Sequence, residues 1–151
     1  MTYRNRETKK RFDIIKNENG DQFDATEVGG TDKGRIDYEI DGHDMLLHTI
    51  FANPEQGSGL GSILMYLAVK DAIERECTRV KILSAAPDAR EFYFNMGCRV
   101  NTDLLSATQQ LGAFVGIGEG KILVKQCPIE GEATTVLNAT HESMFKRWEP
   151  T

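Results

Sequence analysis

The sequence predicts an α+β fold, in which a mixed sheet is combined with helices rather than built from regular βαβ units. Two observations carry this prediction. The first third of the chain reads as short strands joined by turn-forming residues, and after it the apolar spacing changes from a period of two to a helical period. A length of 151 residues fits one domain over residues 1–151, and 40% hydrophobic with 27% charged residues is ordinary for a globular protein.

Four strands are predicted before the first helix. They alternate apolar and polar residues and are separated by Gly-, Asn- and Asp-containing turns, except that the fourth is more continuously apolar and is therefore expected near the centre of the sheet. The four strands are Arg11–Lys16, Gln22–Val28, Arg35–Ile40 and Met45–Phe51.

Helices and strands then follow one another to the end of the chain. The predicted elements are a helix from Leu60 to Glu76, a strand Val80–Ser84, a helix Ala89–Met96, a strand Cys98–Asn101, a helix Asp103–Leu111, a strand Lys121–Gln126 ended by Pro128, and a C-terminal helix within Thr134–Trp148. In that last helix, Met144, Phe145 and Trp148 have the spacing of one packed apolar face.

Charge and cysteine content narrow the function classes. The net charge of −5 and the isoelectric point near 5.2 disfavour a nucleic-acid partner. The basic cluster from Arg4 to Arg11 is interpreted as a solvated N-terminal arm. Three widely spaced cysteines (Cys77, Cys98 and Cys127) predict neither a disulfide framework nor a metal site. Without an apolar leader or a membrane-length apolar run, a cytoplasmic protein with no membrane partner is expected.

One glycine-rich loop carries the chemistry. The run Gln56-Gly57-Ser58-Gly59-Leu60-Gly61-Ser62 lies between a predicted buried strand and an amphipathic helix. Helix-start N–H groups and glycines that let a ligand approach suit a pyrophosphate. A P-loop would need a lysine that is absent here, and the third glycine comes one residue too early for a dinucleotide fingerprint. A plain strand-to-helix turn with packing glycines stays open.

The loop resembles the acetyl-CoA loop of the GNAT superfamily of N-acetyltransferases, through Gln56, Gly59 and Gly61. A second motif of that family, Ala-x-x-x-Tyr-x-x-x-Gly, is similar to Ala89, Tyr93 and Gly97. The chain departs from the family at Ala86, where many members have Asn, and at Cys98, where Phe is usual. The resemblance implies a compact GNAT-type acyl-CoA N-acyltransferase fold, with a mixed, mostly antiparallel twisted sheet and a few flanking helices.

The same resemblance implies how acetyl-CoA would bind. Strands Met45–Phe51 and Val80–Ser84 would splay apart, and the pantetheine arm would pair with backbone groups near Ile50 and Phe51. The pyrophosphate would rest on the loop from Gln56 to Ser62, including Gly57, Ser58, Gly59, Leu60 and Gly61. The implied reaction is direct attack of a primary amine of a small molecule, peptide or protein on the thioester.

Two residues are the catalytic candidates. Tyr93 stands at the family's tyrosine position and would protonate the leaving thiolate, although a buried core aromatic is the alternative. His48 is the titratable group within the central strand and is a candidate base, with Glu39 or water as alternatives. A catalytically degenerate acyl-CoA-binding module is the competing function, acetylation of a charged tRNA is a third, and a homodimer is left open.

Overall fold

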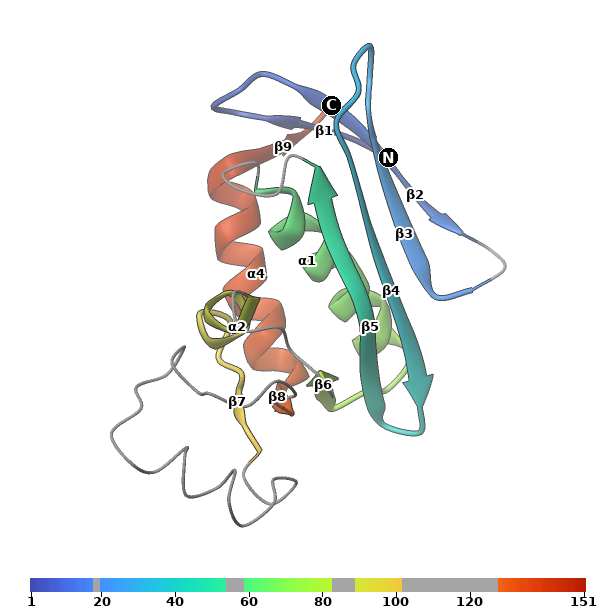
Figure 1. Cartoon of the computed structure of the whole chain (residues 1–151), viewed down its shortest axis with the longest axis vertical. Helices are drawn as coiled ribbons and strands as arrows, with labels where there is room; N and C mark the ends of the chain where they lie inside the picture. Colours follow the sequence, from blue (N-terminus) through green and yellow to red (C-terminus); the bar gives the residue numbers. More distant parts are fainter. Residues whose placement is uncertain (18–19, 54–58, 83–88, 102–127) are drawn as a thin grey trace.

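The strands in the described part of the chain form one nine-stranded sheet, ordered β7-β8-β6-β5-β4-β3-β2-β1-β9 (Figure 1). The structure, a computed structural model, describes residues 1–17, 20–53, 59–82, 89–101 and 128–151. The strands are β1 (Thr2–Asn5), β2 (Arg11–Asn17), β3 (Gln22–Glu27), β4 (Lys33–Asp41), β5 (Asp44–Asn53), β6 (Arg79–Ile82), β7 (Arg99–Val100), β8 (Ile129–Glu132) and β9 (Trp148–Pro150).

Three helices complete the described architecture: α1 (Leu60–Glu74), α2 (Arg90–Phe94) and α4 (Ala133–Arg147). All strand pairs are antiparallel except β5 with β6, which are joined through α1 and run parallel. The α+β fold with a mixed, mostly antiparallel sheet is therefore confirmed. None of these helices has both the length and the apolar character that crossing a bilayer requires.

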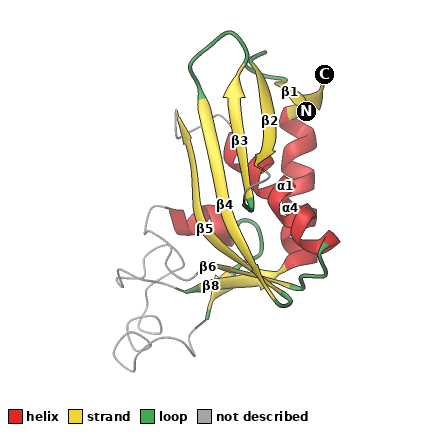
Figure 2. Cartoon of the chain, turned by 90° about the vertical axis from the view of Figure 1, so that its right-hand side faces the viewer, coloured by secondary structure: helices red, strands yellow, loops and turns green. Residues whose placement is uncertain are grey.

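Helix α1 lies between the sheet and α4, and Figures 1 and 2 show α1 and α4 side by side on one face. This position explains why apolar residues surround nearly the whole helix instead of forming one stripe. Close approach to the sheet depends on Gly34 of β4, because a Cβ there would lie 2.8 Å from a methyl carbon of Leu60. The buried residues of α1 are Leu60, Ile63, Leu64, Met65, Leu67, Ala68, Val69 and Ala72.

A hydrogen-bonded cluster ties the far half of α1 to the sheet. The Tyr38 hydroxyl of β4 donates to the Asp71 carboxylate at 2.6 Å, and Lys16 of β2 donates to the other oxygen at 2.9 Å. Burial alone would raise the pKa of Asp71, but these bonds outweigh it and hold the pKa below its usual value. Arg75 also reaches Asp71, at 3.3 Å.

The first four predicted strands are confirmed, each with ends shifted by at most two residues. The predicted helix from Leu60, strand from Val80, helix from Ala89 and strand near Cys98 correspond to α1, β6, α2 and β7 with small boundary shifts. The predicted helix Asp103–Leu111 and strand Lys121–Gln126 lie outside the described residues. Strands β1, β8 and β9 are not among the predicted elements.

Two further expectations need correction. The basic cluster near the N-terminus is not an arm but part of β1, β2 and their connection, and its charges are partly neutralised: Arg4 and Arg6 pair with Glu149, and Lys10 lies 2.7 Å from Asp32. At the C-terminus, Trp148 begins β9 instead of ending the helix. Met144 and Trp148 are buried as expected, but Phe145 is 44% exposed, because it lies off the face of α4 that carries buried Val136, Thr140 and Met144.

The Tyr38–Asp71 bond yields a stability prediction. Tyr38→Phe should lower the free energy of unfolding by about 1–2 kcal/mol at pH 7, since it removes a donor to a carboxylate in a half-buried position. The depressed pKa of Asp71 contributes stability above the unfolded-state pKa near 3.9, and this contribution is lost as the pH falls through the folded-state value. The difference in melting temperature between the native protein and Tyr38→Phe should therefore become smaller below about pH 4.

Thermal melts of both proteins between pH 3 and 7 check this. Tyr66→Phe on α1 is the matched control, because no hydrogen bond of its hydroxyl to another described residue is found, and it should melt like the native protein. A Tyr38→Phe protein as stable as this control at pH 7 would show that the bond contributes nothing.

Candidate functional site

The central feature of the site is the edge of β5 that β6 leaves open. The parallel pairing covers residues 44–47 of β5 and 79–82 of β6, while β5 continues to Asn53. In the described part of the chain, residues 48–53 therefore pair only with β4. Alternate residues of a strand direct their N–H and C=O groups to the side away from a given neighbour. Ile50 and Phe51 lie on this stretch, where an extended ligand could add as a further strand.

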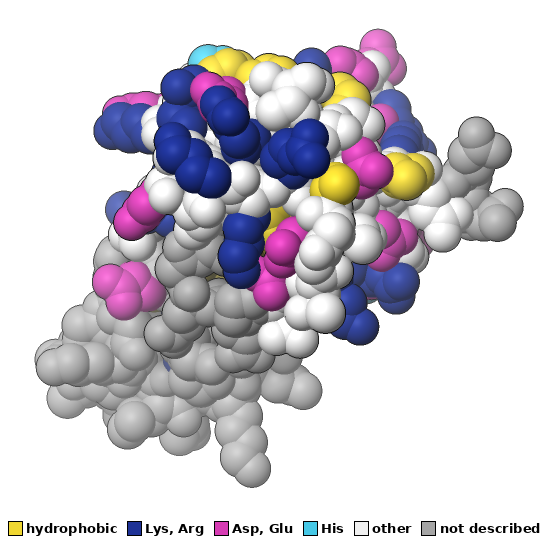
Figure 3. All heavy atoms as spheres, turned by 90° about the horizontal axis from the view of Figure 1, so that it is seen from above, with side chains coloured by type: hydrophobic (Ala, Val, Ile, Leu, Met, Phe, Trp, Pro, Cys, Tyr) yellow, Lys and Arg dark blue, Asp and Glu magenta, His cyan; other side chains and the backbone are white. Residues whose placement is uncertain are grey.

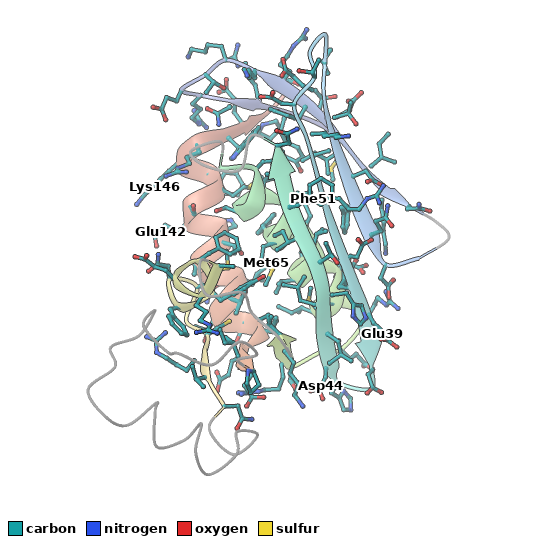
Figure 4. All side chains as sticks on the ribbon, in the orientation of Figure 1. Glu39, Asp44, Phe51, Met65, Glu142 and Lys146 are labelled. Atoms are coloured by element: carbon teal, nitrogen blue, oxygen red, sulfur yellow. The ribbon has the colours of Figure 1, made fainter. Side chains whose placement is uncertain are left out.

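His48 stands where the open stretch begins. The β4–β5 register passes from Asp37↔Thr49 to Tyr38↔Leu47, so His48 is the extra residue of a β-bulge. Its ring is about half exposed, and its Nε2 lies 3.0 Å from a carboxylate oxygen of Glu39 on β4. Figure 4 labels Glu39 on the β4 side of β5, so the imidazole is held toward β4 and away from β6.

The start of α1 follows the open end of β5. Gly59 caps the helix with φ +72°, in the left-handed region that favours glycine, and no side chain caps the first N–H groups. The first turn carries no acidic residue. Leu60 is buried, while Gly61 and Ser62 are partly exposed. The backbone N–H groups of a helix start and the helix dipole favour an anion here. The other predicted loop residues, Gln56, Gly57 and Ser58, lie outside the described residues.

Tyr93 lies on α2 with its ring 95% buried, leaving 5% exposed. Burial raises the pKa of Tyr93 to about 12. No hydrogen bond of its hydroxyl to another described residue is found, and no fully buried polar side-chain atom lacks a partner in the described structure, so the hydroxyl keeps some solvent access. Tyr93 can therefore hold a proton at neutral pH and deliver it to a group that reaches the hydroxyl.

Cys98, four residues after the end of α2, is fully buried, and burial raises the pKa of its thiol to about 11. A protonated thiol without solvent access is a poor nucleophile, so Cys98 acts as a packing residue. The Tyr93 and His48 side chains are not brought into contact: no hydrogen bond joins them, and His48 is engaged with Glu39.

A pocket of about 270 Å³ lies beside the start of α1. Its walls come from the first turn of α1, from α2 and the turn after it, and from the last two turns of α4, with Ser62, Phe92, Asn95, Ser143 and Arg147 among the lining residues. Figure 3 shows Lys and Arg side chains gathered on the end of the molecule where α4 and the N-terminal strands meet. The pocket beside the start of α1 thus has one basic residue, Arg147, among its lining residues.

The contribution of α4 to this site was not predicted from the sequence. Arg147 approaches Gly59 closely: an ideal Cβ on Gly59 would lie 3.1 Å from Arg147 Cδ and 3.4 Å from Nη1. No carboxylate in the described part of the chain pairs with the Arg147 guanidinium. A basic residue in the last turn of a helix is ordinary in sequence, because it complements the helix dipole, and so gave no signal of a site.

Comparisons with known proteins agree with this geometry. The model of the acetyltransferase (GNAT) family matches residues 7–97. An N-acetylglutamate synthase from Neisseria gonorrhoeae, solved with coenzyme A and N-acetyl-glutamate, has a TM-score of 0.52 at 14% identity, over 75% of this chain and 26% of that one. A nourseothricin acetyltransferase has a TM-score of 0.50 at 18% identity, over 82% of this chain and 84% of that one.

The solved structures and the family model support different conclusions. At such low identity, the two solved structures speak for the fold alone, and this chain spans about a quarter of the length of the Neisseria enzyme. No curated protein sequence matches the chain. The family model, by contrast, covers more than half of the sequence, from the connection before β2 to the glycine that ends the α2 region. The chain belongs to the acetyltransferase (GNAT) family.

Proposed function

We propose that this protein is an acetyl-CoA-dependent N-acetyltransferase, which transfers the acetyl group to a primary amine of a small molecule, peptide or protein by direct attack. The observation that carries the proposal is that two features suited to such a ligand, a free strand edge and a helix start, follow one another along the chain. The open edge of β5 precedes the start of α1, which no side chain caps, so one elongated ligand with an amide-rich arm and a diphosphate could use both.

Acetyl-CoA supplies an acyl thioester, an arm with two amides, and phosphates. The backbone near Ile50 and Phe51 would pair with the arm, and the N–H groups from Gly59 to Ser62, with residues 56–58, would hold the diphosphate. The fit is supported by the absence of acidic side chains in the first turn and by the nearby Arg147. The coenzyme A recorded with the Neisseria synthase adds support from a protein of the same fold.

The proposed chemistry assigns a proton to each candidate side chain. The attacking amine must lose a proton, and the departing sulfur gains one. Tyr93, with its pKa raised to about 12, holds a proton that it could donate to the sulfur. His48 or Glu39, joined at 3.0 Å, could accept the proton of the amine directly or through water. The carboxylate of Glu39 beside His48 suits an acceptor that arrives as a cation.

The Ser62→Asp substitution tests the proposed anion site at the start of α1. Ser62 is the third residue of α1, where a carboxylate is favourable to the helix dipole but would repel a bound diphosphate. The variant should melt at or above the native temperature yet bind CoA at least about ten-fold more weakly, as expected from losing one charge-assisted bond. Calorimetric titration with CoA measures the affinity.

Thr134→Asp is the matched control, since it adds the same charge to the exposed first turn of α4 and should leave CoA affinity unchanged. Gly59 is a poor choice, because its left-handed φ and its contacts with Arg147 and Trp148 would make any substitution strain the fold. Equal affinity of the Ser62→Asp and native proteins would place the phosphates elsewhere, and no binding by the native protein would contradict the proposed function.

The Tyr93→Phe substitution tests whether Tyr93 is the proton donor. Removing a positioned general acid should lower kcat by about 10²- to 10⁴-fold. The affinity for CoA should change little, since the ring and its packing remain. Because the pKa of Tyr93 is about 12, the native rate should not fall on the alkaline side until the pH approaches that value. Steady-state rates from pH 6 to 10 with a panel of amines measure both effects.

Tyr3→Phe, at another buried tyrosine on β1, serves as the control and should retain full turnover. A Tyr93→Phe enzyme with native turnover would make Tyr93 a core aromatic only. A native protein that binds CoA but acetylates no amine would favour the competing function, an acyl-CoA-binding module without catalysis.

A further inference from the structure

The indole of Trp148 makes a direct contact with the predicted cofactor loop. Trp148 is the first residue of β9 and has no solvent exposure. Its Nε1 donates a hydrogen bond to the backbone carbonyl of Gly59 at 3.2 Å, across 89 positions of the chain. Gly59 is the residue that caps α1 in the left-handed conformation. The last residues of the chain therefore reach the start of the helix at which the phosphates are proposed to bind.

The indole of Trp148 packs closely against Gly59. A Cβ on this glycine would lie 3.1 Å from Trp148 Nε1, so the indole fills the space that a side chain would need. Within α1, the Gly59 carbonyl accepts only a long bond from the Ile63 N–H, at 3.4 Å. Of these two donors the indole N–H is the closer to the carbonyl, and it helps to set the direction of the peptide at which α1 begins.

Trp148 is itself held firmly. Its ring packs edge-on against Phe12 of β2, with centroids 5.5 Å apart and planes at 70°. Its backbone lies in β9 opposite Asn5 of β1, where the two ends of the chain pair. The indole is therefore held in place by the sheet, and its position determines where the Gly59 carbonyl finds its donor.

We propose that Trp148 is a positioning residue for the acyl-CoA diphosphate, holding the Gly59 carbonyl so that the start of α1 keeps its anion-binding conformation without ligand. This inference rests on the proposed function. Affinity for a ligand that binds one conformation is reduced by the fraction of protein outside it. Losing the indole bond lowers the populated fraction of the binding conformation and so weakens CoA, while Tyr93 and the open β5 edge are left intact.

The chain contains one tryptophan, which permits a sharp test. Expression with β-(3-benzothienyl)alanine in place of tryptophan changes residue 148 alone, keeps the bicyclic shape, and replaces the N–H with sulfur. The expected result is roughly two- to ten-fold weaker CoA binding by calorimetry, the range for one hydrogen bond. The KM for acetyl-CoA should rise with kcat largely retained, a split that general loss of structure would not produce.

Phe23→Leu is the control for a loosened core, because Phe23 is buried on β3, where its ring stacks on Tyr38 and not on the indole. It should lower the melting temperature and leave CoA affinity within about two-fold of native, a difference of under about half a kcal/mol. The positioning role is overturned if the sulfur analogue binds CoA like the native protein, or if Phe23→Leu weakens CoA equally. A native protein that binds no CoA instead overturns the proposed function itself.

Discussion

The burial of α1 between the sheet and α4 is the constraint on which the rest of the structure depends. Eight of its residues are buried, so the helix cannot slide or rotate without exposing apolar surface on one side or creating a clash on the other. Its far half is further held through Asp71, bonded to Tyr38 and Lys16 from two different strands. A helix fixed in this way also fixes where its first turn points.

The site follows from that placement. Because α1 connects β5 to the parallel strand β6, its first turn comes directly after the end of β5 at which pairing with β6 has already stopped. The proposed thioester ligand would meet polar and apolar groups in different places. Backbone N–H groups and Arg147 lie at the start of α1, where negative charge is favourable, whereas the Tyr93 ring is buried.

The two catalytic candidates differ in how the structure supports them. Tyr93 combines a buried ring, a raised pKa and a hydroxyl without a partner in the described part of the chain. These three features suit a group that donates its proton to a bound ligand. His48 owes its position to a bulge in β5, and bulges commonly re-aim side chains near sites. Its bond to Glu39 orients the imidazole toward β4.

The sequence by itself determined the elements whose patterns are local. Four alternating strands, the helix from Leu60, and the glycines that suit a ligand at its start could be predicted, because periodicity and backbone freedom depend on neighbouring residues. Only the tertiary structure decided the roles of α4, β8 and β9. That Arg147 and Trp148 reach Gly59 depends on how the chain ends pair across the sheet, a contact between residues 88 and 89 positions apart that no local pattern encodes. The same reason explains why Trp148 looked like a helix residue and proved to be the start of a strand.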